Sequence, residues 1–499
     1  MEPIEKLRKI RLEKLAKIKK LGINPYPAKS QKSQSISECL KLQGSPDKIS
    51  SKFGRVKKVS TAGRIMGIRT HGGSTFADLV DQSGKIQLFF SQSQLSAVNC
   101  QLLSLIDIGD FIQTTGKVGK TQAGETTIFV EDFGLLAKSL RPVPQSFYGL
   151  KDIETRLRKR YLDLITNPEV RDLFVKKAKF WSSIRQYLTN CGFMEVETPA
   201  LEPIPGGADA TPFITHHKVL DTDFYLRISL ELYQKRLLVG GFEKIFEIGK
   251  VFRNEGIDAQ HLQDYLQMEF YWAYADYETL MDFIPQMYKF VAENTLGTTK
   301  SKFAGKVINW SKPWPKIDYA DSFKQETKFD ILKDISRDQL FDLAKKIGAK
   351  PPKNIGEGRL IDLIYKKAVR PKIIQPSFLI NHPISISPLA KRNRKNPKTV
   401  QRIQVLACGT EVGNGFSELN DPLDQEERFR QQQHLRKLGD QEAQMYDQEF
   451  VQALEYGMPP AAGFGLSQRL FAVLVDKPIR ETVFFPTLRP DLPAGKAGK

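Results

Sequence analysis

The chain has 499 residues, which is too long for one hydrophobic core and predicts roughly two to four domains. Lysine and arginine number 75 against 57 aspartate and glutamate residues, so the formal net charge is +18. A chain this basic, with ordinary sequence complexity, indicates a polyanionic partner, and nucleic acid is the leading class. A general solubility trait is the alternative that charge alone leaves open.

Cysteine spacing and hydropathy exclude several classes of protein. The four cysteines are scattered at positions 39, 100, 191 and 408, without a Cys-x-x-Cys pair. This spacing argues against a zinc knuckle or a disulfide framework and is typical of a cytoplasmic protein. No apolar run reaches the roughly 18 residues of a membrane span, and the N-terminal residues are charged throughout, so we expect neither membrane association nor secretion.

Residues 1–58 predict a basic helix followed by a polar connector. Between Ile4 and Lys20, apolar residues recur at helical spacing among lysines and arginines, and Gly22 and Pro25 end the pattern. A short helix is expected within the connector at 31–58. The basic helix could lie along phosphates or dock its apolar stripe on a neighbouring domain, and the sequence leaves both possibilities open.

Residues 59–140 change to short alternating strands separated by glycines. A helix near 94–105 interrupts them, and this pattern is typical of an OB-fold β-barrel. The expected strands lie at 60–66, 74–79, 85–90, 110–114 and 126–130. OB-folds stack bases on aromatic rings set in a polar groove. We therefore predict that Phe76, Gln87 and Glu125, which supply a ring, an amide and a carboxylate, contact nucleic acid.

A linker is predicted at 141–160, because Arg141-Pro142-Val143-Pro144 is stiffened by its prolines. A second domain is expected over 161–490. Asn167-Pro168 begins a long helix that Gly192 ends, since proline suits the first helical position and glycine the C-terminal cap.

Two features complete the predicted second domain. Helical patterns at 329–347 and 358–368 indicate an insertion at about 310–371. Residues 491–499 are predicted to form a frayed tail.

The stretch Phe252-Arg253-Asn254-Glu255 lies between two apolar runs, 244–248 and 270–274. These runs predict two antiparallel strands joined by a loop that carries His261. Arg253 and Glu255 are two positions apart, so in a strand both side chains would point to the same face. Opposite charges presented together suit a binding site, but structural ion pairs do the same, and these residues alone leave both interpretations open.

These elements, in this order, resemble motifs 1, 2 and 3 of the class II aminoacyl-tRNA synthetases. The motifs are the long helix with its following strand, the Arg253-Asn254-Glu255-Gly256 hairpin, and the Gly463-Phe464-Gly465 turn that leads to Arg469. The chain is most similar to lysyl-tRNA synthetases of this class, in a divergent, bacterial-like form. Segments that carry this closer resemblance are Pro205–Ala208, Phe213–His217, Tyr225–Ile228, Val239–Glu243 and Gly413–Asn420. It implies an α+β, multidomain protein, with an N-terminal OB-fold barrel and an antiparallel-sheet catalytic domain.

The resemblance implies ATP-dependent activation of L-lysine to lysyl-adenylate and transfer of lysine to the 3′ end of tRNA(Lys). Both reactants are anionic where they meet, so the site needs fixed positive charge. Arg253 is expected to contact the α-phosphate and the lysine carboxylate, and Arg469 is the second implied catalytic residue. The implied ATP-binding residues are Arg253, Glu255, His261, Tyr265 and Arg469.

The side chain of the implied amino-acid substrate is a cation, which predicts buried carboxylates in its pocket. Glu418 and Tyr271 are expected beside the ε-ammonium, and Glu231 and Glu269 beside the α-amino group. The implied lysine-binding residues are Gly207, Glu231, Arg253, Glu269, Tyr271, Asn414, Phe416 and Glu418. The resemblance also implies Mg²⁺ at Glu411 and Gln404, anticodon binding by the barrel residues Phe76, Gln87 and Glu125, and a homodimer.

Three departures from the family pattern bear on activity. Gln404 stands where the family usually has a second metal-binding glutamate, so weaker metal binding is expected. Motif 3 is one residue shorter than its commonest form and has Gln468 in place of an acid, and the loop after Gln260 lacks the usual arginine. Together the departures suggest a divergent lineage or altered metal use, and they leave open a non-catalytic or altered-specificity homologue that binds tRNA. An aspartyl- or asparaginyl-type relative is a separate alternative, although Glu418 stands where an aspartyl enzyme would need a cation.

Overall fold

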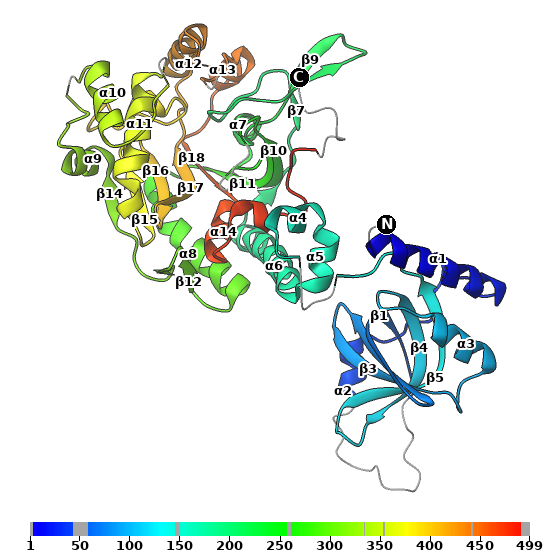
Figure 1. The fold of residues 1–499 in the computed structure, drawn as a ribbon. Helices are drawn as coiled ribbons and strands as arrows, with labels where there is room; N and C mark the ends of the chain where they lie inside the picture. The colour runs from blue at the N-terminus through cyan, green and yellow to red at the C-terminus, as the bar shows by residue number, and fades with distance from the viewer. Residues whose placement is uncertain are drawn as a thin grey trace. The chain divides into compact units, whose positions relative to one another are not determined.

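The computed structural model describes residues 3–42, 58–144, 150–256, 261–333, 335–352, 355–440 and 443–490. The chain divides into two compact units, Met1–Lys151 and Asp152–Lys499, drawn in Figure 1. In the residues described, no helix is long and apolar enough to cross a membrane.

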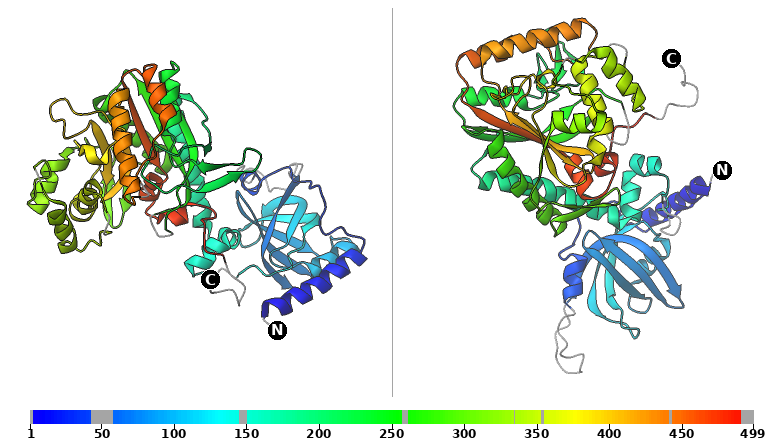
Figure 2. Two further views of the ribbon diagram at one scale, coloured as in Figure 1. Left: turned by 90° about the horizontal axis from the view of Figure 1, so that it is seen from above. Right: turned by 90° about the vertical axis from the view of Figure 1, so that its left-hand side faces the viewer.

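The first unit is a closed barrel with strand order β1-β2-β3-β5-β4, which confirms the predicted OB-fold (Figure 2). Its elements are β1 (Lys58–His71), β2 (Ser74–Asp81), β3 (Gly84–Ser91), α3 (Ala97–Leu105), β4 (Phe111–Lys120) and β5 (Thr126–Ala137). Leu79, Leu88 and Ile128 point inward and are fully buried. A Cβ at Gly116 would lie 2.2 Å from the Phe129 carbonyl oxygen, so the close approach of β4 and β5 requires glycine there.

The N-terminal helix α1 (Pro3–Lys20) docks on the barrel, and α2 (Ile36–Lys41) forms the short helix expected in the connector. Arg11 donates from Nη2 to the Ile108 carbonyl oxygen at 2.9 Å, and Lys14 pairs with Asp107 at 2.6 Å. Ile18 is fully buried in the barrel core. Docking of α1 is thus realised, through polar and apolar contacts together, and contact of its exposed lysines with phosphate stays a prediction.

The second unit is built on an eight-stranded sheet with order β14-β15-β16-β17-β18-β11-β10-β6. The strands are β6 (Met194–Glu195), β10 (Lys244–Phe252), β11 (Asp264–Ala273), β14 (Lys316–Asp318), β15 (Ser377–Ile380), β16 (Arg402–Ala407), β17 (Thr410–Ser417) and β18 (Ala461–Ser467). All neighbouring strands pair antiparallel except at the two edges, where β6 and β14 are parallel to their neighbours. The predicted antiparallel catalytic sheet, including the β10–β11 hairpin, is confirmed.

Helices α6 (Pro168–Asn190), α8 (Tyr277–Leu296) and α14 (Arg469–Leu474) cover one face of this sheet (Figure 2). Because strand side chains alternate, Met268 and Phe270 of β11 enter this core, and Glu269 and Tyr271 point to the opposite face. On that opposite face α7 (Glu231–Val239), α12 (Pro422–Lys437) and α13 (Gln448–Glu455) form a smaller core with β10 and β11.

The remaining elements connect or extend these layers. They are α4 (Ile153–Arg158), α5 (Arg160–Thr166), β7 (Leu201–Glu202), β8 (Ile214–His217), β9 (Thr222–Leu226), β12 (Lys300–Phe303), β13 (Lys306–Asn309), α9 (Tyr319–Thr327), α10 (Arg337–Lys346), α11 (Glu357–Ala368) and the 3₁₀ turns η1 (Arg370–Lys372), η2 (Ile384–Ile386) and η3 (Ile479–Thr482).

Residues 152–160, expected in the linker, are helical and belong to the second unit. Asp152 caps α4 by accepting from the Thr155 backbone N–H at 2.7 Å. Arg156 and Arg160 both pair with the buried Asp163, at 2.8 and 2.5 Å. Capping and buried ion pairs therefore fold this stretch onto the second unit.

The expected insertion is a helical module with its own core, in which the rings of Tyr319 and Tyr365 stack with centroids 4.2 Å apart. Its boundary differs from the predicted one. Trp310 and Trp314 pack into the core of the main sheet, and β14 pairs with β15 at the sheet edge. The separate module thus begins after β14, at α9.

Candidate active site

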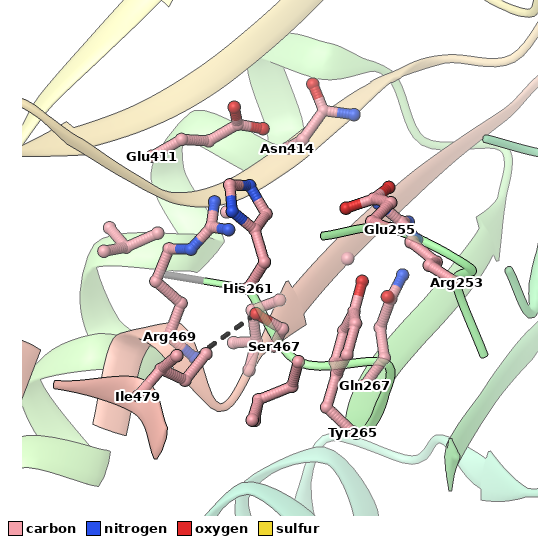
Figure 3. Close-up of a pocket in the computed structure, with 15 residues that line it drawn as sticks. Arg253, Glu255, His261, Tyr265, Gln267, Glu411, Asn414, Ser467, Arg469 and Ile479 are labelled. Atoms are coloured by element: carbon pink, nitrogen blue, oxygen red, sulfur yellow. Dashed lines mark hydrogen bonds between the residues drawn. The ribbon is translucent and has the colours of Figure 1, made fainter. Parts of the chain in front are cut away.

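A pocket opens on the sheet face opposite α6 and α8, between β11, β17, β18 and the loop that follows β10 (Figure 3). The side chains that line it come from segments far apart in the sequence. They are Arg253, Glu255, His261, Leu262, Tyr265, Gln267, Glu411, Val412, Gly413, Asn414, Gly465, Leu466, Ser467, Arg469 and Ile479. All five residues predicted to bind ATP are among them.

Arg253 and Glu255 reach the pocket by a route that differs from the predicted one. β10 ends at Phe252, so neither residue lies in the strand and the argument from strand alternation was wrong. The Arg253 backbone N–H donates to the Gln263 carbonyl oxygen at 2.8 Å, and that of Asn254 to the Thr211 carbonyl oxygen at 2.8 Å. These bonds fix an irregular loop that still directs both charged side chains into the pocket.

The loop that departs from the family pattern is tied down by Gln263. Its side-chain amide donates to the carbonyl oxygens of Gly256 at 3.1 Å and of Glu255 at 3.4 Å. Residues 257–260 lie outside the described residues, and His261 follows them. Figure 3 shows the imidazole of His261 beside the guanidinium of Arg469, with Glu411 beyond them. One side of the pocket is therefore basic and suits an anion.

Tyr265 forms the floor of the pocket near Arg253. The Arg253 guanidinium lies 5.7 Å from the centroid of the Tyr265 ring. This ring would present a flat face to a planar ligand, and the nearby guanidinium a fork of donors to an acidic one.

Deeper in the same face, Glu269 is held by four hydrogen bonds. It accepts from Ser229 Oγ at 3.0 Å, the Leu230 backbone N–H at 3.1 Å, Gln267 Nε2 at 2.5 Å and Tyr271 Oη at 2.9 Å. Burial raises the pKa of Glu269, and the donors at Leu230, Tyr271 and Ser229 oppose that rise. The donors fix the carboxylate in position and favour its charged form.

Two further buried carboxylates lie beside it. Glu231 and Glu418 are 5% and 1% exposed, and the ammonium of Lys235 lies between them. Oε1 of Glu418 has no hydrogen-bond donor among the described residues. A Cβ at Gly463 would lie 2.3 Å from this oxygen and 2.4 Å from Cε1 of Tyr271, so both side chains converge on the glycine.

The other predicted pocket residues border these acids. Gly207 has φ +84°, and a Cβ there would lie 2.8 Å from Ser229 Oγ and 2.9 Å from Glu231 Cβ. Asn414 accepts a hydrogen bond from Arg402 Nε at 2.8 Å. The centroid of the Phe416 ring lies 5.2 Å from Lys235 Nζ. The structure therefore brings together all eight residues predicted to bind lysine.

Three residues of this site were missed in the sequence. Lys235 lies four residues after Glu231 in α7, a spacing that places both on one helix face. Gln267 lies two residues before Glu269 and shares its strand face. Both could have been found from these spacings. The third missed residue, Arg402, could not, because its hydrogen bond to Asn414 depends on the pairing of β16 with β17.

Magnesium coordination was predicted for Glu411 and Gln404. Glu411 lines the pocket, while Gln404 is largely buried opposite Asn414 in the β16–β17 pairing. Among the described residues, no group of three or more His, Cys, Asp or Glu side chains could hold a metal. The single carboxylate of Glu411 fits Mg²⁺, because this ion usually keeps waters and takes further oxygens from phosphates, whereas Gln404 does not line the pocket.

The residues predicted to bind nucleic acid lie together on the outside of the barrel. Gln87 donates from Nε2 to Glu125 at 3.3 Å. The ring of Phe76 lies opposite Phe89, with centroids 5.0 Å apart, and Phe129 continues the row at 5.6 Å from Phe89. Phe89 was missed, although it lies two residues after Gln87 and so on its strand face. The three rings form a platform suited to stacked bases.

Comparison with known proteins tests whether the chain resembles the lysine-, aspartate- or asparagine-specific synthetases. A family described as "tRNA synthetases class II (D, K and N)" matches residues 152–489, and the "OB-fold nucleic acid binding domain" matches 59–136. The lysine–tRNA ligase of Carboxydothermus hydrogenoformans is 44% identical over 493 residues, covering 98% of this chain and 99% of that protein. Those of Moorella thermoacetica and Roseiflexus sp. are 42% and 43% identical, each with 98% of this chain and 99% of the relative covered.

The chain belongs to the lysine–tRNA ligase family. The class II model alone covers three amino-acid specificities, and the full-length relatives select the lysine–tRNA ligases among them. In this family member the departure at Gln468 is accommodated by the fold. The side chain of Gln468 is buried, accepts from Lys177 Nζ at 3.2 Å and donates to Thr482 Oγ1 at 3.4 Å.

Proposed function

We propose that the protein activates L-lysine with ATP to form lysyl-adenylate and transfers the lysine to the 3′ end of tRNA(Lys). The observation that carries this proposal is the link between the basic pocket and the acids beside it: Gln267 lines the pocket with Arg253 and Arg469, and its side chain donates to Glu269, one of the three buried carboxylates. A triphosphate suits the first region, and an amino acid with a cationic side chain suits the second.

Arg253 is the group proposed to join the two reactants. Attack of the lysine carboxylate on the α-phosphorus brings two anions together, and a guanidinium fork can contact carboxylate and phosphate at once. His261 and Arg469 would contact the distal phosphates, and Glu255 and Tyr265 the adenine. No covalent nucleophile is needed, because orientation and charge neutralisation accelerate this reaction.

Within the amino-acid pocket, Glu231 and Glu269 are proposed to bind the α-ammonium. Glu418 and Tyr271 are proposed to bind the ε-ammonium, in support of which Glu418 keeps one oxygen without a donor among the described residues. Asn414 and Phe416 would shape the walls. Gly207 would allow the backbone to close over the amino acid, since a side chain there would collide with Ser229 and Glu231.

We propose that Mg²⁺ accompanies ATP and is held by Glu411, with the amide oxygen of Gln404 as a neutral second ligand. When bound, the ion neutralises phosphate charge and orients the triphosphate. Glu411 lines the pocket, and Gln404 pairs with Asn414 on the adjacent strand. Because an amide carries no charge, we expect weaker metal binding than from two carboxylates.

The proposed function predicts lysine-dependent exchange of pyrophosphate into ATP. Purified protein should catalyse exchange with lysine and with none of the other nineteen standard amino acids. Because of Gln404, the rate should require a high magnesium concentration. No exchange at saturating magnesium would favour a non-catalytic homologue that binds tRNA, and exchange with aspartate or asparagine would favour those specificities.

The barrel is proposed to bind the anticodon through Phe76, Gln87 and Glu125. Phe76→Ala should lower kcat/KM for tRNA aminoacylation by roughly 10- to 100-fold, since stacking of one base contributes about 1–3 kcal/mol. Lysine-dependent exchange, which needs no tRNA, should be unchanged. Phe111→Ala removes another partly exposed ring of the barrel and is the control. Equal losses in aminoacylation and exchange would make Phe76 structural.

We further propose that the protein is a cytoplasmic homodimer. Met194, Leu201 and Ile214, in the segment after the motif 1 helix, expose apolar side chains that suit an interface. The four cysteines are free thiols, which is typical of a reducing compartment.

A further inference from the structure

Lys235 is a buried cation inside the pocket proposed to receive lysine. Its side chain has no exposed surface, and its ammonium lies 2.5 Å from Glu231 Oε1 and in ion-pair contact with Glu418. A fully buried lysine is rare unless paired, and this one contacts two acids that we assign to the substrate. The protein thus places a lysine side chain of its own beside the substrate site.

The aromatic walls hold this ammonium in place. Lys235 Nζ lies 5.2 Å from the centroid of the Phe416 ring and 5.9 Å from that of Phe450. A cation over aromatic faces gains stabilisation, more so without water. Lys235 comes from α7, Phe450 from α13 and Glu418 from the segment after β17, so three elements fix its position.

The charges of the pocket match those of lysine only when Lys235 is included. With all three carboxylates ionised in the complex, Glu231, Glu269 and Glu418 bring three negative charges, and the paired Lys235 reduces the excess to two. The substrate brings two ammonium groups, while its carboxylate is matched by Arg253. Without Lys235, one buried carboxylate would stay unbalanced in the complex, which is costly.

The arginines near the amino-acid pocket form hydrogen bonds or ion pairs with groups other than the three pocket carboxylates. The charge of Arg402 of β16 acts to lower the pKa of Glu231, but its guanidinium donates to Asn414, the Ile386 carbonyl oxygen and Ser387. Arg227 pairs with Glu247 at 2.6 Å, and Arg236 pairs with Asp447 at 2.8 Å. Lys235 therefore contributes the cation that contacts the pocket acids directly.

We propose that Lys235 is a positioning and specificity residue that sets the net charge of the amino-acid pocket to accept a doubly cationic substrate. It acts through Glu231 and Glu418, which it holds in position by contacting both. Burial raises the pKa of Glu418 well above its ordinary value, and Lys235 opposes this rise. The inference rests on the proposed function, because the substrate it assumes is lysine.

The test compares Lys235→Met with Gln234→Met in lysine-dependent pyrophosphate exchange. Both positions lie in α7, both side chains are fully buried, and both variants receive the same side chain. For Lys235→Met we expect KM for lysine to rise on the order of 100-fold, with KM for ATP within about threefold of the parent protein. Gln234→Met should leave both constants within about threefold.

A double-variant cycle separates charge matching from a merely structural role. Glu231→Gln in the parent leaves the complex with one excess positive charge, whereas in Lys235→Met it restores the balance. The increase in KM for lysine caused by Glu231→Gln should therefore be at least about tenfold smaller in the Lys235→Met background. Thermal melting of each variant reports whether it is folded.

Failure of this inference is distinguishable from failure of the proposed function. If the parent protein shows no lysine-dependent exchange, the proposed function fails, and the inference with it. If the parent is active but Lys235→Met leaves KM for lysine unchanged, only the role of Lys235 is overturned. It is also overturned if KM for ATP rises in parallel, or if the effects of Lys235→Met and Glu231→Gln add independently.

Discussion

Replacing Arg253 by methionine is expected to lower kcat/KM for lysine-dependent pyrophosphate exchange by about 10³-fold, equivalent to roughly 4 kcal/mol of transition-state stabilisation. The guanidinium lies beside Tyr265 in the pocket that also holds Glu255. It is the proposed contact of both reacting groups, so its loss leaves two anions to approach without a shared cation. The methionine side chain keeps apolar bulk but cannot donate hydrogen bonds.

The matched control is Lys250→Met in the preceding strand β10. This side chain is 56% exposed, pairs with Asp264 and does not line the pocket. The Lys250→Met substitution removes the same formal charge from the same hairpin as Arg253→Met. Because Lys250 is exposed and lies outside the pocket, this substitution should change kcat/KM by less than about threefold. Steady-state exchange kinetics of both variants measure the difference. Equal effects would mean that the field of the whole hairpin, and not contact by Arg253, supports the reaction.

Comparison of the predicted and observed positions of Arg253 shows what sequence patterns can and cannot predict. Alternation in a strand placed Arg253 and Glu255 on one face, but the strand ends one residue earlier. Their position instead depends on backbone bonds to Gln263 and Thr211, which come from distant or irregular segments. The two opposite charges close together in sequence correctly indicated a pocket, but the strand conformation assumed for them was wrong.

Periodic patterns predicted the barrel because burial imposes alternation residue by residue, whereas the antiparallel sheet of the second unit was implied by the family resemblance. The inward side chains Leu79, Leu88 and Ile128 alternate with outward ones, and the helix–strand–hairpin order fixes the second unit. Boundaries were less predictable. The linker is shorter than predicted because Arg156 and Arg160 pair with Asp163 in the second unit. Periodic sequence patterns do not encode such ion pairs.

The acidic pocket illustrates a second limit. Glu231, Glu269 and Glu418 were found through family resemblance, which carries ligand-contacting residues but not the residues that support them. Lys235 and Gln267 share a helix face or strand face with those acids and could have been inferred from spacing alone. What spacing cannot give is that Glu418, nearly 200 residues later, meets the same ammonium as Glu231.

Glu418→Gln is the second substitution with a large expected effect, a rise of about 10³-fold in KM for lysine. Glu418 is 1% exposed, and its Oε1 has no donor among the described residues, so its charge is available to the substrate ammonium. The amide keeps the shape but cannot neutralise a buried cation, and breaking a buried pair costs about 3–5 kcal/mol. KM for ATP should stay within about threefold, because Glu418 does not line the basic pocket.

The control for Glu418→Gln is Glu449→Gln in α13. Glu449 is 76% exposed and lies 3.5 Å from Arg236, so its loss should change neither Michaelis constant by more than about threefold. A rise in KM for ATP equal to that for lysine would indicate a distorted fold and contradict the assignment of Glu418.

Comparison of Glu418→Gln with Lys235→Met gives the strictest test of the pocket's chemistry. One change removes a negative charge and the other a positive charge from the same ion-pair contact. If the pocket only attracted cations, removing Lys235 would lower KM for lysine. We expect both substitutions to raise it, because the complex is most stable when the buried charges balance and each substitution leaves one of them unmatched.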